Sequence, residues 1–211
     1  LGTNPIAFAV PTGDGPPLVL DMATSTVSWG KIEVARRAGA PLPVGWAVDH
    51  GGHPATDAAS ARWLMPLGGE ATTGGHKGYG LAALVDVLCG PLAGAAWSAH
   101  VAGSRSTPAD ADIDHTFLVW RIDLFREPAE FYRDLQAMLD ELRATRPAAG
   151  HETTGVLIPG DPELAAEAAN RTHGIPLRPA LVTELRALAD ELGLRFPAPA
   201  APTGPGSLAP G

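Results

Sequence analysis

Residues 66–81 hold six glycines and the pair His76-Lys77, and they run directly into the apolar stretch 81–88. Such a density of glycine is typical of a tight turn, because glycine adopts backbone conformations that other residues avoid. The apolar residues that follow predict a buried helix over 81–92. The pattern therefore predicts a glycine-rich turn that leads into the amino end of a helix.

A turn of this kind suits an anion. Backbone N–H groups can approach the ligand closely, and the helix amino terminus adds partial positive charge. Lys77 and His76 would bring side-chain donors to the same place. The spacing matches neither familiar phosphate loop, because Gly78 stands where a Walker A motif needs Ser or Thr and no strand-GxGxxG-helix unit precedes it. Two interpretations stay open: a plain turn that caps a helix, and an anion or cofactor site.

Composition and charge exclude several classes of protein. The 211 residues, 45% apolar and 18% charged, are enough for one large domain or one and a half with a real core. A net charge of −8 with scattered basic residues argues against nucleic-acid binding. We expect no membrane span and no signal peptide, because long apolar runs are missing. The single cysteine, Cys89, is expected to be a small buried residue, and it favours a reducing compartment, with the cytoplasm as default.

Strand-like and helix-like patterns alternate along the chain. Four segments predict strands by their β-branched, aromatic or alternating apolar residues: 5–10, 18–20, 116–122 and 156–158. Six segments predict helices by apolar periodicity, charge placement and flanking Gly or Pro: 24–38, 57–64, 81–92, 128–143, 163–171 and 179–192. The helix at 128–143 carries an apolar stripe formed by Phe131, Leu135, Met138 and Leu142.

The remaining segments predict turns and loops. Residues 44–57 read as a loop that contains a glycine turn, and its histidines, His50 and His53, lack a third ligand, so no metal site is expected. Residues 98–114 are polar and rich in Gly, Ser and Pro, which is typical of a mobile loop. Residues 196–211 are of low complexity and are expected to be disordered.

Several polar residues are candidates for function, and each has a simpler interpretation. Asn4, before Pro5, offers a donor and an acceptor that suit a carboxamide or ribose hydroxyls, but the residues alone favour an Asx turn. Asp21 ends an apolar strand, where a carboxylate is either partly buried and hydrogen-bonded or caps the next helix. The segment 159–161, Pro-Gly-Asp, can be a plain turn. Tyr79, between two glycines, is expected to pack and to fix the turn.

Several segments occur together in the order and register of one known family. They are Leu1-Gly-Thr-Asn-Pro-Ile-Ala-Phe-Ala-Val-Pro11, residues 20–33, Gly45-Trp-Ala-Val-Asp49 with Thr56-Asp57, Gly74-Gly-His-Lys-Gly-Tyr-Gly-Leu81, Leu157-Ile-Pro-Gly-Asp161 and His173-Gly-Ile-Pro-Leu177. The chain thereby resembles, from Leu1 to about residue 194, the type 2 malate/L-lactate dehydrogenase family. These are nicotinamide-dependent 2-hydroxyacid and imine reductases whose fold is not the Rossmann fold.

The resemblance implies a fold, a cofactor and a set of site residues. The fold would be α/β, with a mixed, largely antiparallel sheet, covering helices and a non-Rossmann site for NAD or NADP. Asp21 would lie near the active site, where a carboxylate orients the catalytic histidine or relays a proton. The resemblance implies cofactor contacts from eight residues: Asn4, Pro5, Ile6, His76, Lys77, Pro159, Gly160 and Asp161. The substrate would be a small 2-hydroxyacid or 2-oxoacid, and the enzyme would be a homodimer.

The resemblance also predicts how the chain is organised into domains. Residues 1–150 would form part of the NAD(P)-binding domain, and residues 151–195 would pack on an N-terminal portion that family members carry ahead of the Gly-Thr-Asn-Pro segment. In the family that portion supplies the catalytic histidine and a substrate-binding arginine. We therefore expect a truncated member that is inactive alone. The alternatives are a cyclic-imine carboxylate or ureidoglycolate-type enzyme of the same family, and a non-catalytic cofactor-binding fragment.

Overall fold

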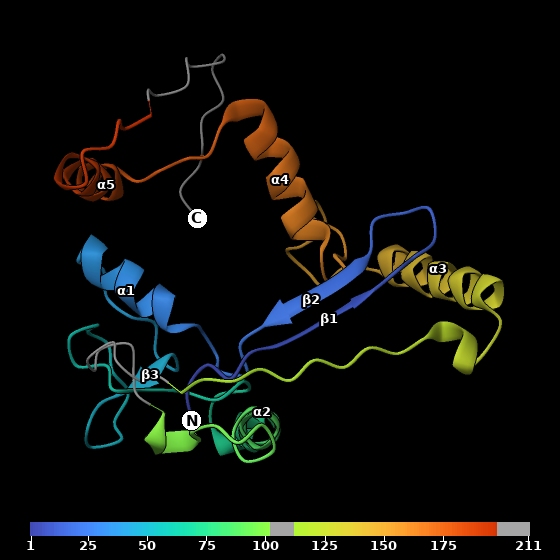
Figure 1. Ribbon diagram of the computed structural model, residues 1–211, viewed down its shortest axis with the longest axis horizontal. Coiled ribbons are helices and arrows are strands. Elements are labelled where there is room, and N and C mark those ends of the chain that lie inside the picture. Colours follow the sequence, from blue (N-terminus) through green and yellow to red (C-terminus); the bar gives the residue numbers. More distant parts are fainter. Residues whose placement is uncertain (102–111, 198–211) are drawn as a thin grey trace. The chain divides into compact units, whose positions relative to one another are not determined.

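The computed structural model describes residues 1–101 and 112–197 (Figure 1). The chain divides into two compact units, residues 1–138 and 139–211, and each is described by itself. Parts of two predicted flexible segments, the loop 98–114 and the tail 196–211, lie outside the described residues.

The described elements form an α/β chain. The strands are β1 (Ile6–Val10), β2 (Leu18–Met22), β3 (Ala47–Val48) and β4 (Trp63–Leu64). The helices are α1 (Trp29–Ala38), α2 (Gly75–Cys89), α3 (Pro128–Ala144), α4 (Asp161–His173) and α5 (Pro179–Glu191), with 3-10 turns η1 (Ala71–Thr73), η2 (Ser98–His100) and η3 (Ile122–Leu124). Both strand pairs are antiparallel, as expected, but within the described residues they form two separate two-stranded sheets rather than one larger sheet.

The hairpin of β1 and β2 confirms the first two predicted strands. Ile6 lies opposite Met22, and Val10 lies opposite Leu18. The connecting turn is closed by Thr12, whose hydroxyl donates a hydrogen bond of 2.9 Å to the Pro16 carbonyl. A polar turn between two strand patterns thus folds as local propensity predicts.

Helix α1 begins at Trp29, later than the predicted start at residue 24. The residues ahead of it are held by other partners: the Thr26 N–H donates to the Met65 carbonyl at 2.8 Å, and the Ser25 hydroxyl donates to the Val27 carbonyl at 2.7 Å. These bonds keep the backbone non-helical, because they use groups that a helix would need. The end of the helix is as predicted.

The core of residues 1–138 is built on one face of α1. Ile32 is fully buried there, and the residues around it are mostly alanines from the loops and short strands that follow. The buried cluster consists of Val27, Ile32, Ala35, Leu42, Ala47, Ala55, Ala58 and Ala61, with Trp29, Trp46 and Leu64 packed against it. Small side chains let these backbone segments approach closely, so little volume separates α1 from the β3–β4 hairpin.

Three predicted elements are wrong. Residues 57–60 form a turn in which the Asp57 carboxylate accepts the Ala59 N–H at 3.0 Å, and strand β4 follows where a helix was predicted over 57–64. A local side-chain bond of this kind competes with a helix. Residues 116–122 and 156–158 form no strand in the described part of the chain; the first runs into η3.

The three long C-terminal helices are confirmed. Helices α4 and α5 both carry proline in their first turn, as expected of helix starts. The stripe predicted on α3 is only partly buried: Leu135 is 9% exposed, whereas Met138 and Leu142 are exposed and Leu139 is buried in addition. None of the helices in the described ranges combines the length and the apolar content needed to cross a membrane.

Candidate functional site

The glycine-rich segment folds differently from the predicted turn. Helix α2 already begins at Gly75, so His76 and Lys77 lie in its first turn rather than in a loop ahead of residue 81. Gly74 precedes the helix with a φ of 95°, a left-handed conformation that favours glycine. The turn proper is therefore confined to residues 66–74, and the glycines that follow belong to a helix.

Two of the helical glycines are required by close packing. A Cβ atom at Gly75 would lie 1.9 Å from the Gly69 carbonyl oxygen, and one at Gly78 would lie 2.1 Å from the Leu67 carbonyl oxygen. No real side chain tolerates such distances from backbone atoms. The turn thus lies directly against the first turns of α2, with main chain touching main chain.

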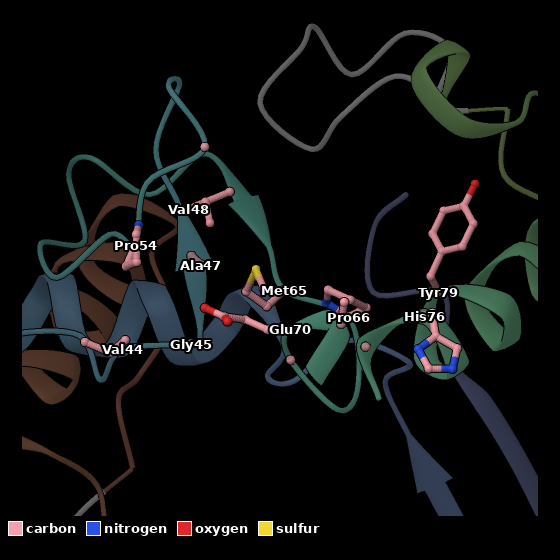
Figure 2. A pocket seen from close by; sticks show the side chains of 14 residues that line it. Val44, Gly45, Ala47, Val48, Pro54, Met65, Pro66, Glu70, His76 and Tyr79 are labelled. Carbon is pink, nitrogen blue, oxygen red and sulfur yellow. The ribbon is translucent and has the colours of Figure 1, made fainter. Parts of the chain in front are cut away.

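A pocket of about 580 Å³ lies beside this contact (Figure 2). One wall comes from the β3 hairpin and the other from the turn and α2. The lining residues are Val44, Gly45, Ala47, Val48, Gly52, Pro54, Met65, Pro66, Gly69, Glu70, Ala71, Gly75, His76 and Tyr79. Apolar walls with few polar groups suit a flat, largely apolar ring of a small molecule or cofactor.

Three side chains give the pocket its polar character. Figure 2 shows His76 and Tyr79 next to each other on α2, while the Glu70 carboxylate points toward the β3 side. His76 and Tyr79 are three residues apart on a helix, a spacing that places both on one face. Tyr79 is 60% exposed, so the expectation that it packs to fix the turn is wrong. The set offers an imidazole, a phenol and a carboxylate to a ligand.

Lys77 lies on the same helical turn as His76 but does not line the pocket. Its side chain is exposed and passes over Gly74, at the amino terminus of α2. The first turn of α2 has no acidic residue to offset the positive end of the helix. The lysine and the helix end together favour a negatively charged group there. No group of three metal-ligating side chains occurs in the part of the chain that the structure describes.

Asn4 joins the first strand to α2. Its side-chain amide donates to the Ala82 carbonyl at 2.9 Å and to an Asp86 carboxylate oxygen at 3.5 Å, and its own carbonyl accepts the Thr24 hydroxyl at 2.8 Å. Asn4 also takes a positive φ of 37°. Pro5 and Ile6 continue from it into β1. Asn4 thus binds to α2 about two turns beyond His76 and Lys77, at Ala82 and Asp86.

Asp21 differs from its expected setting. It is exposed in β2, opposite Ala7, and it is neither partly buried nor the cap of α1, whose capping position is Ser28. Thr24, the other candidate cap, instead donates its hydroxyl to the Thr3 and Asn4 carbonyls. The catalytic role of Asp21 stays a prediction.

The segment 159–161 lies in the other unit, at the start of α4. Gly160 has a φ of 102° and precedes the helix, and Asp161 is its first residue. The Asp161 carboxylate accepts hydrogen bonds from Arg143 Nη2 at 2.9 Å and Nε at 3.3 Å, and from the Ile158 N–H at 3.0 Å. Pro159 lies exposed between these anchor points. Asp161 therefore fixes the loop, whatever else it binds.

Asp161 is expected to make the stability of residues 139–211 depend on pH. The Arg143 guanidinium and, next, the Ile158 N–H hold the pKa of Asp161 below its ordinary value of 3.8. A lowered pKa stabilises the folded form at neutral pH, and that contribution is lost as the pH falls below 3.8 through the folded value. Asp161→Asn should therefore cost about 1 kcal/mol at neutral pH and less in acid, because the pair is partly exposed.

Thermal unfolding of the two forms between neutral pH and about pH 3 checks this. The matched control is Glu163→Gln, which removes one negative charge from the same helical turn and keeps the pair of Arg143 with Asp161. An equal loss in both variants would contradict the role of the Arg143 pair and would leave only the general effect of charge at a helix start.

The structure thus brings together some of the predicted site residues and adds others. His76 and Lys77 are part of helix α2, and Asn4 is hydrogen-bonded to it. Glu70 and Tyr79 were missed as pocket residues, and so was the apolar wall from the β3 hairpin. A helix predicted to begin at Gly75 would have indicated Tyr79, because it would then share a face with His76.

Comparisons with known proteins match nearly the whole chain. A family model described as malate/L-lactate dehydrogenase matches residues 1–186. A malate dehydrogenase from Pyrococcus horikoshii is 37% identical over 198 residues, which are 92% of this chain and 54% of that protein. A Δ1-pyrroline-2-carboxylate/Δ1-piperideine-2-carboxylate reductase from Pseudomonas aeruginosa is 50% identical over 116 residues, 53% of this chain and 34% of that protein.

Solved structures give the same result for the fold. The crystal structure of malate dehydrogenase from Entamoeba histolytica matches with a TM-score of 0.81 at 26% identity, over 92% of this chain and 56% of that one. The chain spans about half the length of these two malate dehydrogenases.

Proposed function

Because the chain belongs to the malate/L-lactate dehydrogenase family, we propose that it forms the cofactor-binding portion of an NAD(P)-dependent oxidoreductase. The reaction is hydride transfer between the nicotinamide cofactor and a small 2-hydroxyacid or 2-oxoacid. The family membership and the α/β fold, shared with solved malate dehydrogenases, confirm the resemblance noted in the sequence. The observation that carries the proposal is the apolar pocket whose rim includes His76, beside the amino end of α2.

The residues present fit the two chemical halves of such a cofactor. Apolar walls from the β3 hairpin suit a flat heteroaromatic ring, and the exposed face of Tyr79 suits a stacking contact with it. Lys77 and the helix amino terminus suit a pyrophosphate. When bound, the nicotinamide ring would carry the hydride, and the protein would orient it and exclude water.

A second candidate function within the family is reduction of a cyclic imine carboxylate. What favours it is the identity of 50% with the Pseudomonas aeruginosa reductase, although that match covers 116 residues only. Both reactions present a carboxylate next to the carbon that receives hydride, so they need similar positioning. Sequence coverage does not separate the two reactions, because other Δ1-pyrroline-2-carboxylate reductases cover 89–90% of this chain and the malate dehydrogenases cover 92%. We propose the hydroxyacid reaction first, because two solved malate dehydrogenases match with TM-scores of 0.81 and 0.76, against 0.62 for a Δ1-piperideine-2-carboxylate reductase.

Nucleotide titration combined with a turnover assay tests these proposals. Calorimetric titration of residues 1–211 with NADH and NADPH would show which nucleotide binds, and assays with oxaloacetate, pyruvate and Δ1-pyrroline-2-carboxylate would rank substrates. We expect residues 1–211 to bind nucleotide without turnover, because the resemblance implies a catalytic histidine in a portion of family members that the match does not cover. Absence of binding to both nucleotides by a folded sample would rule out the cofactor role.

Lys77→Ala is expected to weaken nucleotide binding by about tenfold, the loss of one charge-assisted phosphate contact. The chain's other lysine, Lys31, provides the matched control: it lies on α1 with its ammonium 5.9 Å from the Trp46 ring. Lys31→Ala should leave nucleotide affinity unchanged. Equal weakening in both variants would indicate a general charge effect instead of a placed phosphate contact.

The assembly and the compartment are further proposals. A homodimer rests on the resemblance to the family, and a cytoplasmic location rests on the single cysteine, Cys89. The resemblance to the family is also the basis for a catalytic role of Asp21 and for cofactor binding by residues 159–161.

A further inference from the structure

An exposed apolar segment lies within the connection between helix α2 and helix α3. It comprises residues 116–122, Thr-Phe-Leu-Val-Trp-Arg-Ile, and Figure 1 shows the part before η3 as an extended yellow-green trace. Its four central side chains are among the most exposed large apolar residues of the described chain: Phe117 86%, Leu118 70%, Val119 90% and Trp120 76%. Four adjacent residues of this kind are costly to leave in water, and such patches mark interaction surfaces.

The backbone of this segment is also unpaired. Among the described residues, no backbone N–H or C=O group of residues 113–120 bonds to another backbone group. The Thr116 hydroxyl, which donates to the Leu88 carbonyl at 2.7 Å, anchors the start of the segment to α2. The segment is thus held in place at its start while an extended, strand-forming stretch presents free hydrogen-bonding groups.

The directions of these four side chains indicate how large a partner must be to bury them. In a strand, neighbouring side chains point to opposite faces, so Phe117 and Val119 lie on one face and Leu118 and Trp120 on the other. Both faces are apolar, which is typical of a strand that is buried on both sides within a larger sheet. One added strand, or the same strand of a second copy, would pair one edge and leave both faces bare.

Relatives contain polypeptide of the required size. The family match spans residues 1–186 and so includes this segment, yet the matched part is 54% of the Pyrococcus horikoshii malate dehydrogenase. Slightly less than half of that protein lies outside the match. This is enough chain for strands at the edge of the segment and for cover on its faces.

We propose that residues 116–122 are the docking strand for polypeptide that corresponds to the unmatched part of these relatives. The segment pairs through its backbone with a strand of that polypeptide, and the four apolar side chains become core residues of the joint sheet.

Co-expression provides the test. The probe is the unmatched part of the Pyrococcus horikoshii malate dehydrogenase, produced as a separate chain with residues 1–211 of this protein. We expect the two to co-purify, and we expect amide hydrogen exchange in residues 117–121 to slow by at least about tenfold in the complex. Val119→Asp should abolish co-purification, whereas Val119→Ile, which keeps an apolar β-branched side chain, should preserve it.

Controls make each outcome decisive. The unmatched and matched parts of the Pyrococcus horikoshii enzyme, co-expressed with each other, serve as the positive control. Val119 is 90% exposed, so Val119→Asp should unfold at the same urea concentration as the parent chain when tested alone. Failure to co-purify while the control pair associates would overturn the proposal, and so would a complex without protection of residues 117–121. Self-association of 1–211 that Val119→Asp abolishes would assign the segment to a second copy and would also overturn it.

Discussion

Gly78→Ala is expected to destabilise residues 1–138 by about 3 kcal/mol or more, because it forces backbone apart where there is no room. The new Cβ would meet the Leu67 carbonyl oxygen at 2.1 Å and the Leu67 nitrogen at 2.6 Å. Neither atom belongs to a flexible side chain that could move aside. Urea unfolding followed by tryptophan fluorescence measures the effect, since all five tryptophans lie in this unit.

Gly80→Ala, two residues further along the same helix, is the matched control. No atom lies within 4 Å of a Cβ placed there. Alanine favours a helix interior over glycine, so this change should be neutral or should stabilise by up to about 1 kcal/mol. If both substitutions destabilise equally, the effect comes from helix α2 in general and the close contact with Leu67 is contradicted.

Ile32→Ala is expected to destabilise the same unit by about 3 kcal/mol through the lost apolar contacts and the cavity left behind. Ile32 is fully buried, and it is the largest fully buried side chain described. The other buried residues of its cluster are mostly alanines, which have no side-chain freedom to fill the space. The same fluorescence measurement applies, because Trp29 and Trp46 pack against this cluster.

Val34→Ala controls for the loss of an apolar side chain from α1. Val34 is 46% exposed on the opposite side of the helix from the core residues, so the cost should stay below about 1 kcal/mol. Equal costs at Ile32 and Val34 would contradict the placement of the core on one face of α1.

Local sequence signals predicted the elements whose stability is local. Helices α3, α4 and α5 carry apolar periodicity or terminal prolines within their own residues, and they were located to within a few positions. The start of α1 was misplaced because Thr26 is held by Met65, a residue far along the chain. Residues 116–122 have the composition of a strand, but a strand also needs a pairing partner, which no local pattern reveals.

The candidate site was predicted in part for the same reason. His76 and Lys77 were identified from the glycine-rich segment, and His76 does line a pocket. The glycines were interpreted as signs of a turn, whereas Gly75 and Gly78 are helical and are needed for contact with residues 67–69. That contact is tertiary. Local sequence patterns therefore could not predict where α2 starts or that Tyr79 is exposed.

The contact between the main chain of α2 and that of residues 67–69 affects how the pocket can change in evolution. The wall of the pocket nearest Gly75 is shaped by backbone atoms, and substitutions there carry a heavy penalty in folding. The opposite wall is shaped by side chains such as Val44, Val48 and Met65, which can be exchanged without disturbing that contact. Adaptive change in what the pocket accepts should therefore accumulate on the hairpin side, while the helix side drifts little.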